Sequence, residues 1–248
     1  MKNKVIKAII LAGGYSRRIG LKVPKQLAKI DNRPLLAYTL DAFERCRLVD
    51  SIILVVHKKI VQQCHTLIKK YRFKKIEQLV VGGRTRQMSV FNALGRIRGC
   101  DYVVIHDGVR PFVHQKMILE IIEAAKKFNA ATCAVNAIDT IVEAKKGLLR
   151  RMLCRNELWH IQTPQAFKFD LIYKAHQRAK ARGVFNASDD TQLALRLKNK
   201  IRVIEGSFQN LKITTPFDLY LAKLLLRNRE GLCRSYHLLY QFLMKSGM

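Results

Sequence analysis

Residues 6–14 read Ile6-Lys-Ala-Ile-Ile-Leu-Ala-Gly-Gly14, an aliphatic run that ends in two adjacent glycines. A short apolar run bounded by turn residues is typical of a strand that is buried on both faces of a parallel sheet. The run carries Lys7 and is too short for a secretory signal or a membrane span. We therefore expect a first buried strand with a glycine turn at its carboxyl end.

Similar aliphatic runs recur along the first half of the chain, at residues 52–56, 79–81 and 102–106. Segments with helical spacing separate them: one begins with Pro34 at its first position and runs to about Arg47, and the others span residues 59–70, 85–98 and 116–128. Regular alternation of strands and helices predicts an open, doubly wound α/β fold with a mostly parallel sheet. In such sheets ligands bind at the carboxyl ends of the strands.

The alternation is less regular after Ala131. Residues 132–135 and 138–142 are β-like, whereas residues 143–160 are polar and basic and have no apolar face for a core. This pattern predicts an arm that projects at about residues 136–160. Further elements are predicted at residues 168–182, 189–198, 201–205 and 215–226, which makes residues 1–226 one domain. Residues 227–248 are predicted to be a C-terminal helical tail, with Tyr236, Leu239, Tyr240 and Leu243 at helical spacing.

Composition narrows the classes of function. The 248 residues are 49% hydrophobic, and 46 Lys and Arg against 18 Asp and Glu give 46 − 18 = +28, which favours anionic partners. Six cysteines form no CxxC pair, which excludes a zinc knuckle or a dithiol motif and favours a reducing, cytoplasmic setting. No run is apolar enough to span a membrane. The basic residues are spread along helix faces without an RNA-binding motif, so specific nucleic-acid binding is only a distant alternative.

The loop after the first strand favours a triphosphate. Gly13 and Gly14 allow backbone N–H groups to approach a phosphate, and Arg17, Arg18 and Lys25 bring cations to the same loop. The spacing fits neither a Walker A loop nor a GxGxxG dinucleotide motif. An anion site is therefore favoured over a plain strand-to-helix turn.

Two later loops follow predicted strands. Gly82-Gly83 leads to Ser89, and this turn is read either as a contact to the edge of a base or as a helix start capped by Thr85. Asp107 and Arg110 follow the fourth strand; a carboxylate there requires a cation, a metal or a substrate hydroxyl, and a purely structural ion pair is the alternative. The neighbouring His106 is predicted to be structural.

Taken in order, these motifs identify a resemblance over about residues 5–226. They are Ala12-Gly-Gly…Arg18…Pro24-Lys-Gln26, Gly82-Gly83…Ser89, His106-Asp-Gly-Val-Arg-Pro111, Asp139-Thr140, Arg155…Leu158-Trp159, Thr163-Pro-Gln165 and Asn210-Leu-Lys212. The ordered set resembles the 2-C-methyl-D-erythritol 4-phosphate cytidylyltransferases and their relatives, the ribitol-5-phosphate cytidylyltransferases.

The resemblance implies a Rossmann-like nucleotidyltransferase fold that joins CTP and a polyol phosphate into a CDP-alcohol and pyrophosphate. It implies Mg²⁺ held mainly by the CTP phosphates, with no protein ligand assigned, and a homodimer in which the arm crosses to the second subunit. Carried over to this chain, it assigns catalysis at the α-phosphate to Arg18 and Lys25, and nucleotide binding to Ala12, Gly13, Gly14, Gly82, Gly83 and Ser89. It assigns polyol phosphate binding to Asp107, Arg110, Thr140, Arg155 and Lys212, with Thr140 and Arg155 serving the partner's site.

The resemblance makes the methylerythritol branch, which serves isoprenoid precursor biosynthesis, the first hypothesis and the ribitol branch the alternative, and two departures keep the choice of alcohol open. Gly13 and the Gly108-Val109 pair stand where the methylerythritol enzymes commonly carry alanines, and this form is shared with the ribitol branch. Arg155…Trp159 and Ser188-Asp-Asp-Thr191 resemble the methylerythritol branch instead. Arg84 replaces a frequent acidic residue, so the base contact at that position stays unassigned.

Overall fold

A computed structural model describes residues 4–14 and 24–227. Arg18 and the tail beyond Arg227 lie outside the described residues, so their predicted roles stay predictions. The strands of the central sheet are β1 (Ile6–Ala12), β4 (Ser51–Val56), β5 (Ile76–Val81), β6 (Tyr102–Asp107), β7 (Ala130–Asn136), β10 (Trp159–Lys168) and β11 (Arg202–Glu205). The helices are α1 (Leu35–Glu44), α2 (Val61–Tyr71), α3 (Arg86–Leu94), α4 (Gln115–Phe128), α5 (Phe169–Ala181), α6 (Asp190–Leu195) and α7 (Pro216–Arg227).

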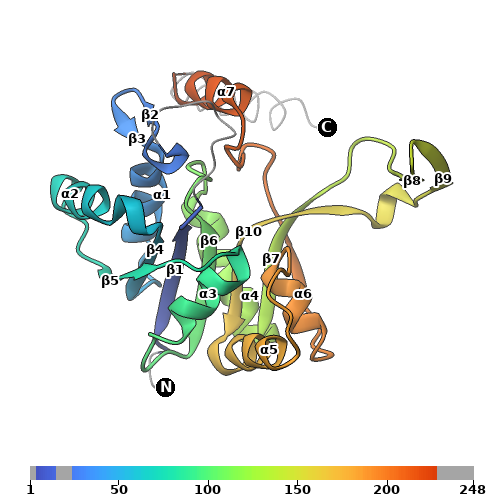
Figure 1. Ribbon diagram of the computed structural model, residues 1–248, viewed down its shortest axis with the longest axis horizontal. Helices are drawn as coiled ribbons and strands as arrows, with labels where there is room; N and C mark the ends of the chain where they lie inside the picture. Colours follow the sequence, from blue (N-terminus) through green and yellow to red (C-terminus); the bar gives the residue numbers. More distant parts are fainter. Residues whose placement is uncertain (1–3, 15–23, 228–248) are drawn as a thin grey trace, which may run out of the picture.

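The described strands form a seven-stranded sheet in the order β11-β7-β10-β6-β1-β4-β5 between two layers of helices (Figure 1). Alternate residues of β1 enter different cores: Ala8 and Ile10 pack with α1, α2 and α4, whereas Ile9 packs with α3, α5 and α6. All three are fully buried. Burial of β1 on both faces explains its unbroken aliphatic sequence and confirms the predicted α/β class.

The strand β10 is the main departure from the predicted order, because the sequence predicts no strand between the arm, which ends at about residue 160, and the helix that begins at about residue 168. It runs antiparallel between β6 and β7, the one antiparallel strand of this described sheet. Its centre is polar, yet Gln162, Thr163 and Gln165 are buried. Gln165 donates to Thr132 Oγ1 at 3.1 Å and to Asp189 Oδ2 at 2.7 Å. Hydrogen bonds from the Gln165 amide nitrogen therefore anchor a strand that lacks the usual apolar pattern.

Other boundaries differ by a few residues. Pro34 precedes α1, because its ψ of 143° is extended and it pairs with Lys29 in the short hairpin of β2 (Lys29–Ile30) and β3 (Arg33–Pro34). The helix α3 ends before Gly95, and α6 ends at Leu195, three residues before the predicted end. Residues 138–141, predicted as β-like, precede the strand that begins at Val142.

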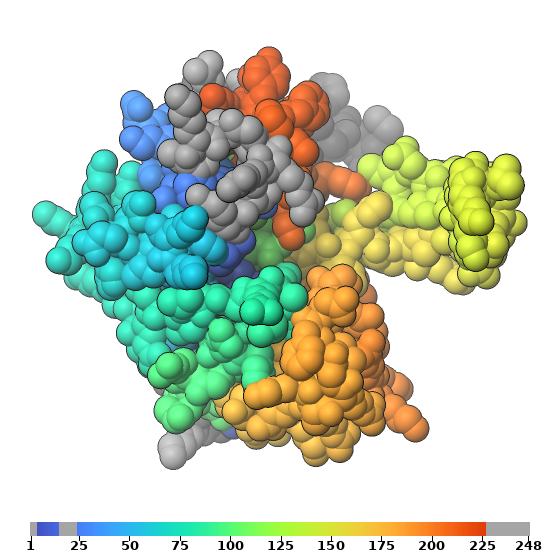
Figure 2. Space-filling view, in the orientation of Figure 1, coloured from blue at the N-terminus to red at the C-terminus, as the bar shows by residue number. Residues whose placement is uncertain are grey.

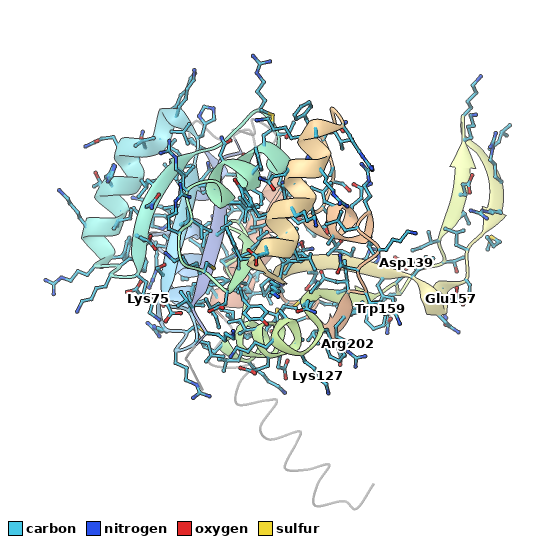
Figure 3. The ribbon with its side chains drawn as sticks, turned by 90° about the horizontal axis from the view of Figure 1, so that it is seen from below. Lys75, Lys127, Asp139, Glu157, Trp159 and Arg202 are labelled. Carbon is cyan, nitrogen blue, oxygen red and sulfur yellow. The ribbon has the colours of Figure 1, made fainter. Side chains whose placement is uncertain are left out.

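The predicted arm is present as a hairpin of β8 (Val142–Lys145) and β9 (Leu148–Met152), which pairs with no other described strand. Figures 1 and 2 show it projecting away from the body. Every residue of the two strands is exposed. Asp139, Glu157 and Trp159 lie along the segments that join the hairpin to the sheet (Figure 3). An isolated two-stranded hairpin is marginal in water, so the arm is a candidate for contact with another chain.

Candidate active site

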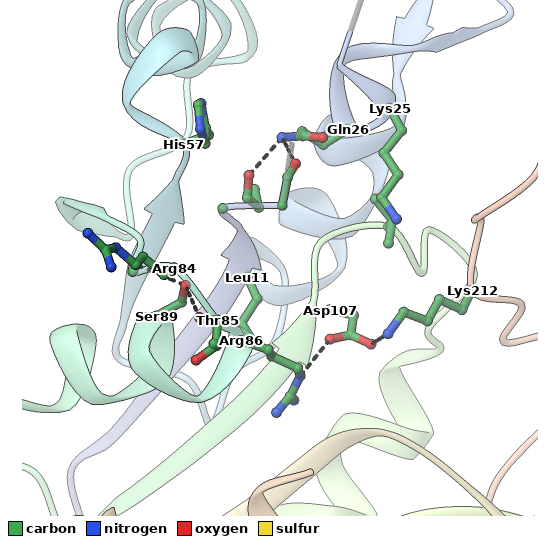
Figure 4. A pocket seen from close by; sticks show the side chains of 15 residues that line it. Leu11, Lys25, Gln26, His57, Arg84, Thr85, Arg86, Ser89, Asp107 and Lys212 are labelled. Carbon is green, nitrogen blue, oxygen red and sulfur yellow. Dashed lines mark hydrogen bonds and ion pairs between the residues drawn. The ribbon is translucent and has the colours of Figure 1, made fainter. Parts of the chain in front are cut away.

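Four parallel strand ends converge on one cavity. The register pairs Ala12 with Val56, Leu11 with Asp107 and Val56 with Val81, so the turns after β1, β4, β5 and β6 lie at the same edge of the sheet. The cavity has a volume of about 430 Å³. Among the described residues it is lined by Leu11, Ala12, Gly13, Gly14, Lys25, Gln26, His57, Gly83, Arg84, Thr85, Arg86, Ser89, Asp107, Val109 and Lys212 (Figure 4).

Two glycine turns form one wall of this cavity. A Cβ at Gly13 would lie 3.5 Å from the Cα of Gly82, so the two turns pack backbone against backbone. Gly82 donates to the Val56 carbonyl at 2.9 Å and lies behind the lining formed by its neighbour Gly83. Small residues here bring two backbone segments together beside the cavity.

The second turn fixes the start of α3. The Ser89 hydroxyl accepts from the Gly83 N–H at 3.0 Å and donates to the Thr85 carbonyl at 2.9 Å. Thr85 caps the helix by accepting from the Met88 N–H at 3.1 Å. The predicted Thr85 cap is confirmed, and the helix presents its N-terminus to the cavity, an electropositive end suited to an anion.

Gly83 has no room for a side chain. A Cβ there would lie 2.4 Å from the Cβ of Met88, in the first turn of α3. We expect Gly83→Ala to displace this turn and to raise the KM for the nucleotide about tenfold, the loss of roughly one hydrogen bond's worth of binding. Steady-state kinetics measures the change. Gly95→Ala, at the other end of α3, is the matched control, because its Cβ would meet its nearest neighbour at 3.5 Å; an equal effect of both variants would contradict the argument.

Lys25 reaches the cavity from a short turn that Gln26 anchors. The buried Gln26 amide donates to the carbonyls of Ala12 at 2.8 Å and of Gly14 at 3.0 Å. This ties the 3-10 turn Lys25–Leu27 to the glycine loop after β1. Gln26 was not predicted to be a site residue, although it belongs to the motif Pro24-Lys-Gln26, which was the signal for it.

Asp107 lies at the centre of a cluster of cations beside the end of β1, where it is in register with Leu11. Its carboxylate lies 2.9 Å from Lys212 Nζ, 3.4 Å from Arg86 Nε and 3.5 Å from Arg110 Nε. Burial alone would raise the pKa of Asp107, but the charges of Arg86, Lys212 and Arg110 lower it well below its usual range. The group is therefore an ionised acceptor at neutral pH.

The structure separates Arg110 from the cavity lining. Arg110 is buried and donates through Nη1 to the Asn210 carbonyl at 2.7 Å. It therefore holds the loop that carries Lys212, which is also tied down by the Ile213 N–H donating to Val109 O at 3.0 Å. Among the described residues, Arg110 contacts the Asp107 carboxylate and the loop that carries Lys212, but it does not line the cavity. Its predicted contact with the polyol phosphate stays a prediction.

His106 is fully buried beside Asp107, and its Nε2 lies 3.2 Å from the Arg110 carbonyl. Burial lowers the pKa of His106 to about 4. A neutral imidazole with no place on the described lining fits the structural role predicted for it.

Arg86 is a lining residue that was not predicted. It stands at the first position of α3 and bridges Asp107 to Asp190, whose Oδ2 lies 2.5 Å from Arg86 Nη1. Attraction to Asp190 and Asp107 outweighs burial and raises the pKa of Arg86. No local sequence pattern could have revealed this bridge, because Arg86 and Asp190 are 104 residues apart.

The remaining predicted residues lie elsewhere. Thr140 and Arg155 are exposed at the base of the arm, and neither is among the described lining residues. Arg155 Nη1 donates to the Ile138 carbonyl at 3.2 Å. One chain therefore gathers Ala12, Gly13, Gly14, Lys25, Gly83, Ser89, Asp107 and Lys212 around the cavity, but not Thr140 or Arg155.

No described cluster of three or more His, Cys, Asp or Glu side chains is placed to hold a metal ion. Asp107 is the one carboxylate among the described lining residues, and three cations already surround it. A metal at this cavity would find few protein ligands among the described residues and would take most of its ligands from water and from bound phosphate oxygens, as Mg²⁺ does.

Known proteins match both the sequence and the fold. The family model of 2-C-methyl-D-erythritol 4-phosphate cytidylyltransferase matches residues 6–228. The enzyme of that name from Clostridium acetobutylicum is 42% identical over 225 residues, which cover 90% of this chain and 98% of the relative. The one from Clostridium beijerinckii is 43% identical over 226 residues, covering 90% and 99%.

Solved structures agree. The 4-diphosphocytidyl-2C-methyl-D-erythritol synthase of Anaerococcus prevotii superposes with a TM-score of 0.81 at 32% identity, covering 91% of this chain and all of that one. The Thermus thermophilus cytidylyltransferase gives a TM-score of 0.72 at 29% identity, covering 89% and 98%. With the two glycine loops, Lys25, Asp107 and Lys212 gathered around one cavity at the strand ends, these matches show that the chain belongs to the 2-C-methyl-D-erythritol 4-phosphate cytidylyltransferase family.

Proposed function

We propose that this protein transfers the cytidylyl group of CTP to 2-C-methyl-D-erythritol 4-phosphate, giving the CDP-alcohol and pyrophosphate in the non-mevalonate route to isoprenoid precursors. The observation that carries the proposal is a single cavity in which a glycine cradle and Lys25 face Asp107 and Lys212. The family match supports the choice of both substrates.

CTP would lie along the glycine wall. Its base and ribose would meet the turn of Gly83 and Ser89 at the N-terminus of α3, and its phosphates would meet the backbone of Ala12, Gly13 and Gly14. Backbone N–H groups and a helix N-terminus are suited to negative charge. We assign the stabilisation of charge at the α-phosphate to Lys25, with Arg18 in the same role.

The polyol phosphate would lie on the opposite side. The ionised Asp107 accepts hydrogen bonds from hydroxyl groups, and Lys212 pairs with the phosphate. Lys25 and Lys212 enter the cavity from neighbouring elements and point into the same space (Figure 4). They lie where two anionic substrates would meet.

The reaction forms one P–O bond and breaks another. An oxygen of the substrate phosphate attacks the α-phosphorus in line, and the bond to the β-phosphate breaks, releasing pyrophosphate. Negative charge gathers on the equatorial oxygens of the α-phosphorus in the transition state, so placed cations stabilise it more than the separated reactants. The attacking phosphate oxygen is already ionised and needs no general base, which agrees with the neutral, buried His106.

We propose that Mg²⁺ accompanies CTP. When bound, it neutralises charge on the phosphate oxygens. Asp107 is the one described lining side chain with a carboxylate ligand to offer, so CTP itself would supply most of the coordination.

The exposed arm supports a homodimer. Leu148, Leu149 and Met152 are 73%, 61% and 62% exposed on the hairpin, which is unusual for apolar side chains in a lone chain. Thr140 and Arg155 lie at the base of this arm and outside the described lining of their own cavity. We propose that the arm crosses to a second copy and delivers both residues to the partner's polyol phosphate.

We further propose that residues 1–226 act as one nucleotidyltransferase domain and that the protein works in the cytoplasm. None of the described helices is long and apolar enough to cross a membrane. We also propose that the protein binds no nucleic acid specifically.

The test is product formation by the purified protein with CTP, Mg²⁺ and 2-C-methyl-D-erythritol 4-phosphate. We expect pyrophosphate release together with a CDP-alcohol identified by mass spectrometry. Ribitol 5-phosphate in parallel is the matched control substrate. Turnover with ribitol 5-phosphate alone would transfer the assignment to that branch, and no turnover with either would overturn the proposal.

A further inference from the structure

Asp190 is a buried carboxylate that does not belong to the described lining of the cavity. It is 1% exposed at the first position of α6. Its Oδ2 accepts from Arg86 Nη1 at 2.5 Å, and its Oδ1 lies 3.0 Å from Nε2 of the fully buried His176. A buried carboxylate is expensive to desolvate, and replacing such a group by an apolar one is often neutral or stabilising. Stability of the fold is therefore a weak explanation for it.

Arg86, the ion-pair partner of Asp190, lines the cavity. Arg86 uses Nη1 for Asp190 and Nε for Asp107 Oδ1, at 3.4 Å, so one rigid guanidinium spans both carboxylates. Its Nη2 is buried without a hydrogen-bond partner among the described residues. Figure 4 shows Arg86 reaching the Asp107 carboxylate from one side while Lys212 reaches it from the other.

Arg86 is the cation between two buried carboxylates, Asp190 and Asp107. Burial would raise the pKa of Asp190, but the Arg86 charge and the hydrogen bond from His176 lower it. Asp190 is therefore ionised at neutral pH, and it shares the single positive charge of Arg86 with Asp107. A planar fork with fixed donors suits such a bridge, whereas the single ammonium of a lysine does not.

Building on the proposed function, we propose that Asp190 is a positioning residue for the polyol phosphate. It holds the Arg86 guanidinium against the back wall of the cavity, so that Arg86 orients Asp107 toward the hydroxyl groups of the substrate and is kept from the incoming phosphates.

The ion pair between Asp190 and Arg86 has its largest effect when substrate binds. In the described structure Lys212 pairs with Asp107 Oδ2, and in the proposed complex it turns to the phosphate of the substrate. Asp107 is then oriented by Arg86 and by Arg110 behind it. Without the charge of Asp190, nothing holds Arg86 on the side away from the cavity, and the negative charge of a bound substrate phosphate draws its guanidinium away from Asp107. Asp107 loses its fixed partner on the Arg86 side.

The test is Asp190→Asn, which keeps the shape of the side chain and removes its charge. We expect the KM for 2-C-methyl-D-erythritol 4-phosphate to rise about tenfold, while kcat and the KM for CTP change less than about threefold, because only the polyol side loses an oriented contact. A purely structural role would instead lower the melting temperature and reduce the active fraction, without separating the two KM values.

Two controls lie at the start of α6 and within it. Asp189→Asn changes the neighbouring N-cap carboxylate, which accepts from Thr191 and Gln165 and acts on Arg86 through its charge alone, less than Asp190 does. Leu193→Ala creates a cavity at a buried apolar position of α6 and lowers the stability of the fold, while Asp190, Arg86 and Asp107 keep their charges. We expect both to leave the ratio of the two KM values unchanged.

A double-mutant cycle links Asp190 to Arg86. Arg86→Lys keeps the charge but cannot span two carboxylates, so we expect it to raise the same KM about tenfold and to add little when combined with Asp190→Asn. Multiplying effects would show independent roles and overturn the proposal, as would an unchanged KM ratio in Asp190→Asn.

The outcome separates this proposal from the proposed function. If the wild-type protein makes the CDP-alcohol and Asp190→Asn has the wild-type ratio of the two KM values, the proposed function stands and the positioning role of Asp190 is contradicted. If ribitol 5-phosphate proves to be the substrate, the same comparison runs with that alcohol. A wild-type protein inactive with both alcohols would overturn both proposals.

Discussion

Lys25→Ala lowers kcat by about 10²–10³-fold and leaves the melting temperature close to that of the wild type, because a cation placed at developing charge is worth a few kcal/mol in the transition state. Lys25 is half-buried at the cavity, on a turn that Gln26 ties to the glycine loop. The turn keeps its anchors in the variant, so the loss is confined to catalysis. Single-turnover kinetics with saturating CTP measures it.

Lys29→Ala is the matched control for this experiment. Lys29 lies four residues further along, on the exposed side of β2, and its removal takes the same charge from the protein. We expect an unchanged kcat. Equal losses in both variants would point to general electrostatic attraction of substrates, and a near-normal kcat in Lys25→Ala would remove Lys25 from the proposed role.

The second large effect concerns the arm. Lys25→Ala and Arg155→Ala are each expected to be inactive, yet a 1:1 mixture of exchanged dimers recovers about a quarter of the wild-type activity, as expected for sites built across a two-fold axis. Half of the dimers are then mixed, and each mixed dimer has one site with both residues intact. The activity of mixed, re-equilibrated subunits measures this recovery.

The control pair is Lys25→Ala with Lys212→Ala. Both residues line the cavity of one chain, so each mixed dimer has one defect in each site and no recovery is expected. Recovery in this pair, or none in the first pair once mixed dimers are shown to have formed, would contradict arm exchange.

Much of the fold was predictable because its signals are local. The run from Ile6 to Ala12 is aliphatic since both faces of β1 are covered by helices, and the glycines after β1 and β5 mark the turns that a cavity at the strand ends requires. The lack of a core face at residues 143–160 likewise predicted the projecting hairpin. Each of these patterns reports on neighbours within a few residues.

The strand β10 was not predictable in the same way. Gln162, Thr163 and Gln165 read as loop residues, and they are stable in the sheet only because Thr132, Asp189 and other distant groups satisfy them. A polar residue carries no mark of the partner that will satisfy it. The same reason explains why Gln26 was not predicted as the anchor of the glycine loop.

By itself, the sequence determined the α/β class, the family and the loops that line the cavity, because strand burial, glycine turns and ordered motifs are patterns of contiguous residues. The tertiary structure alone decided which of those residues share a cavity. Arg110 pairs with Asp107 outside the described cavity lining, and Thr140 and Arg155 lie at the base of the arm. Arg86 pairs with Asp190, which is 104 residues away in the chain. Charges find their partners through space, and only the folded chain sets which carboxylate each guanidinium meets.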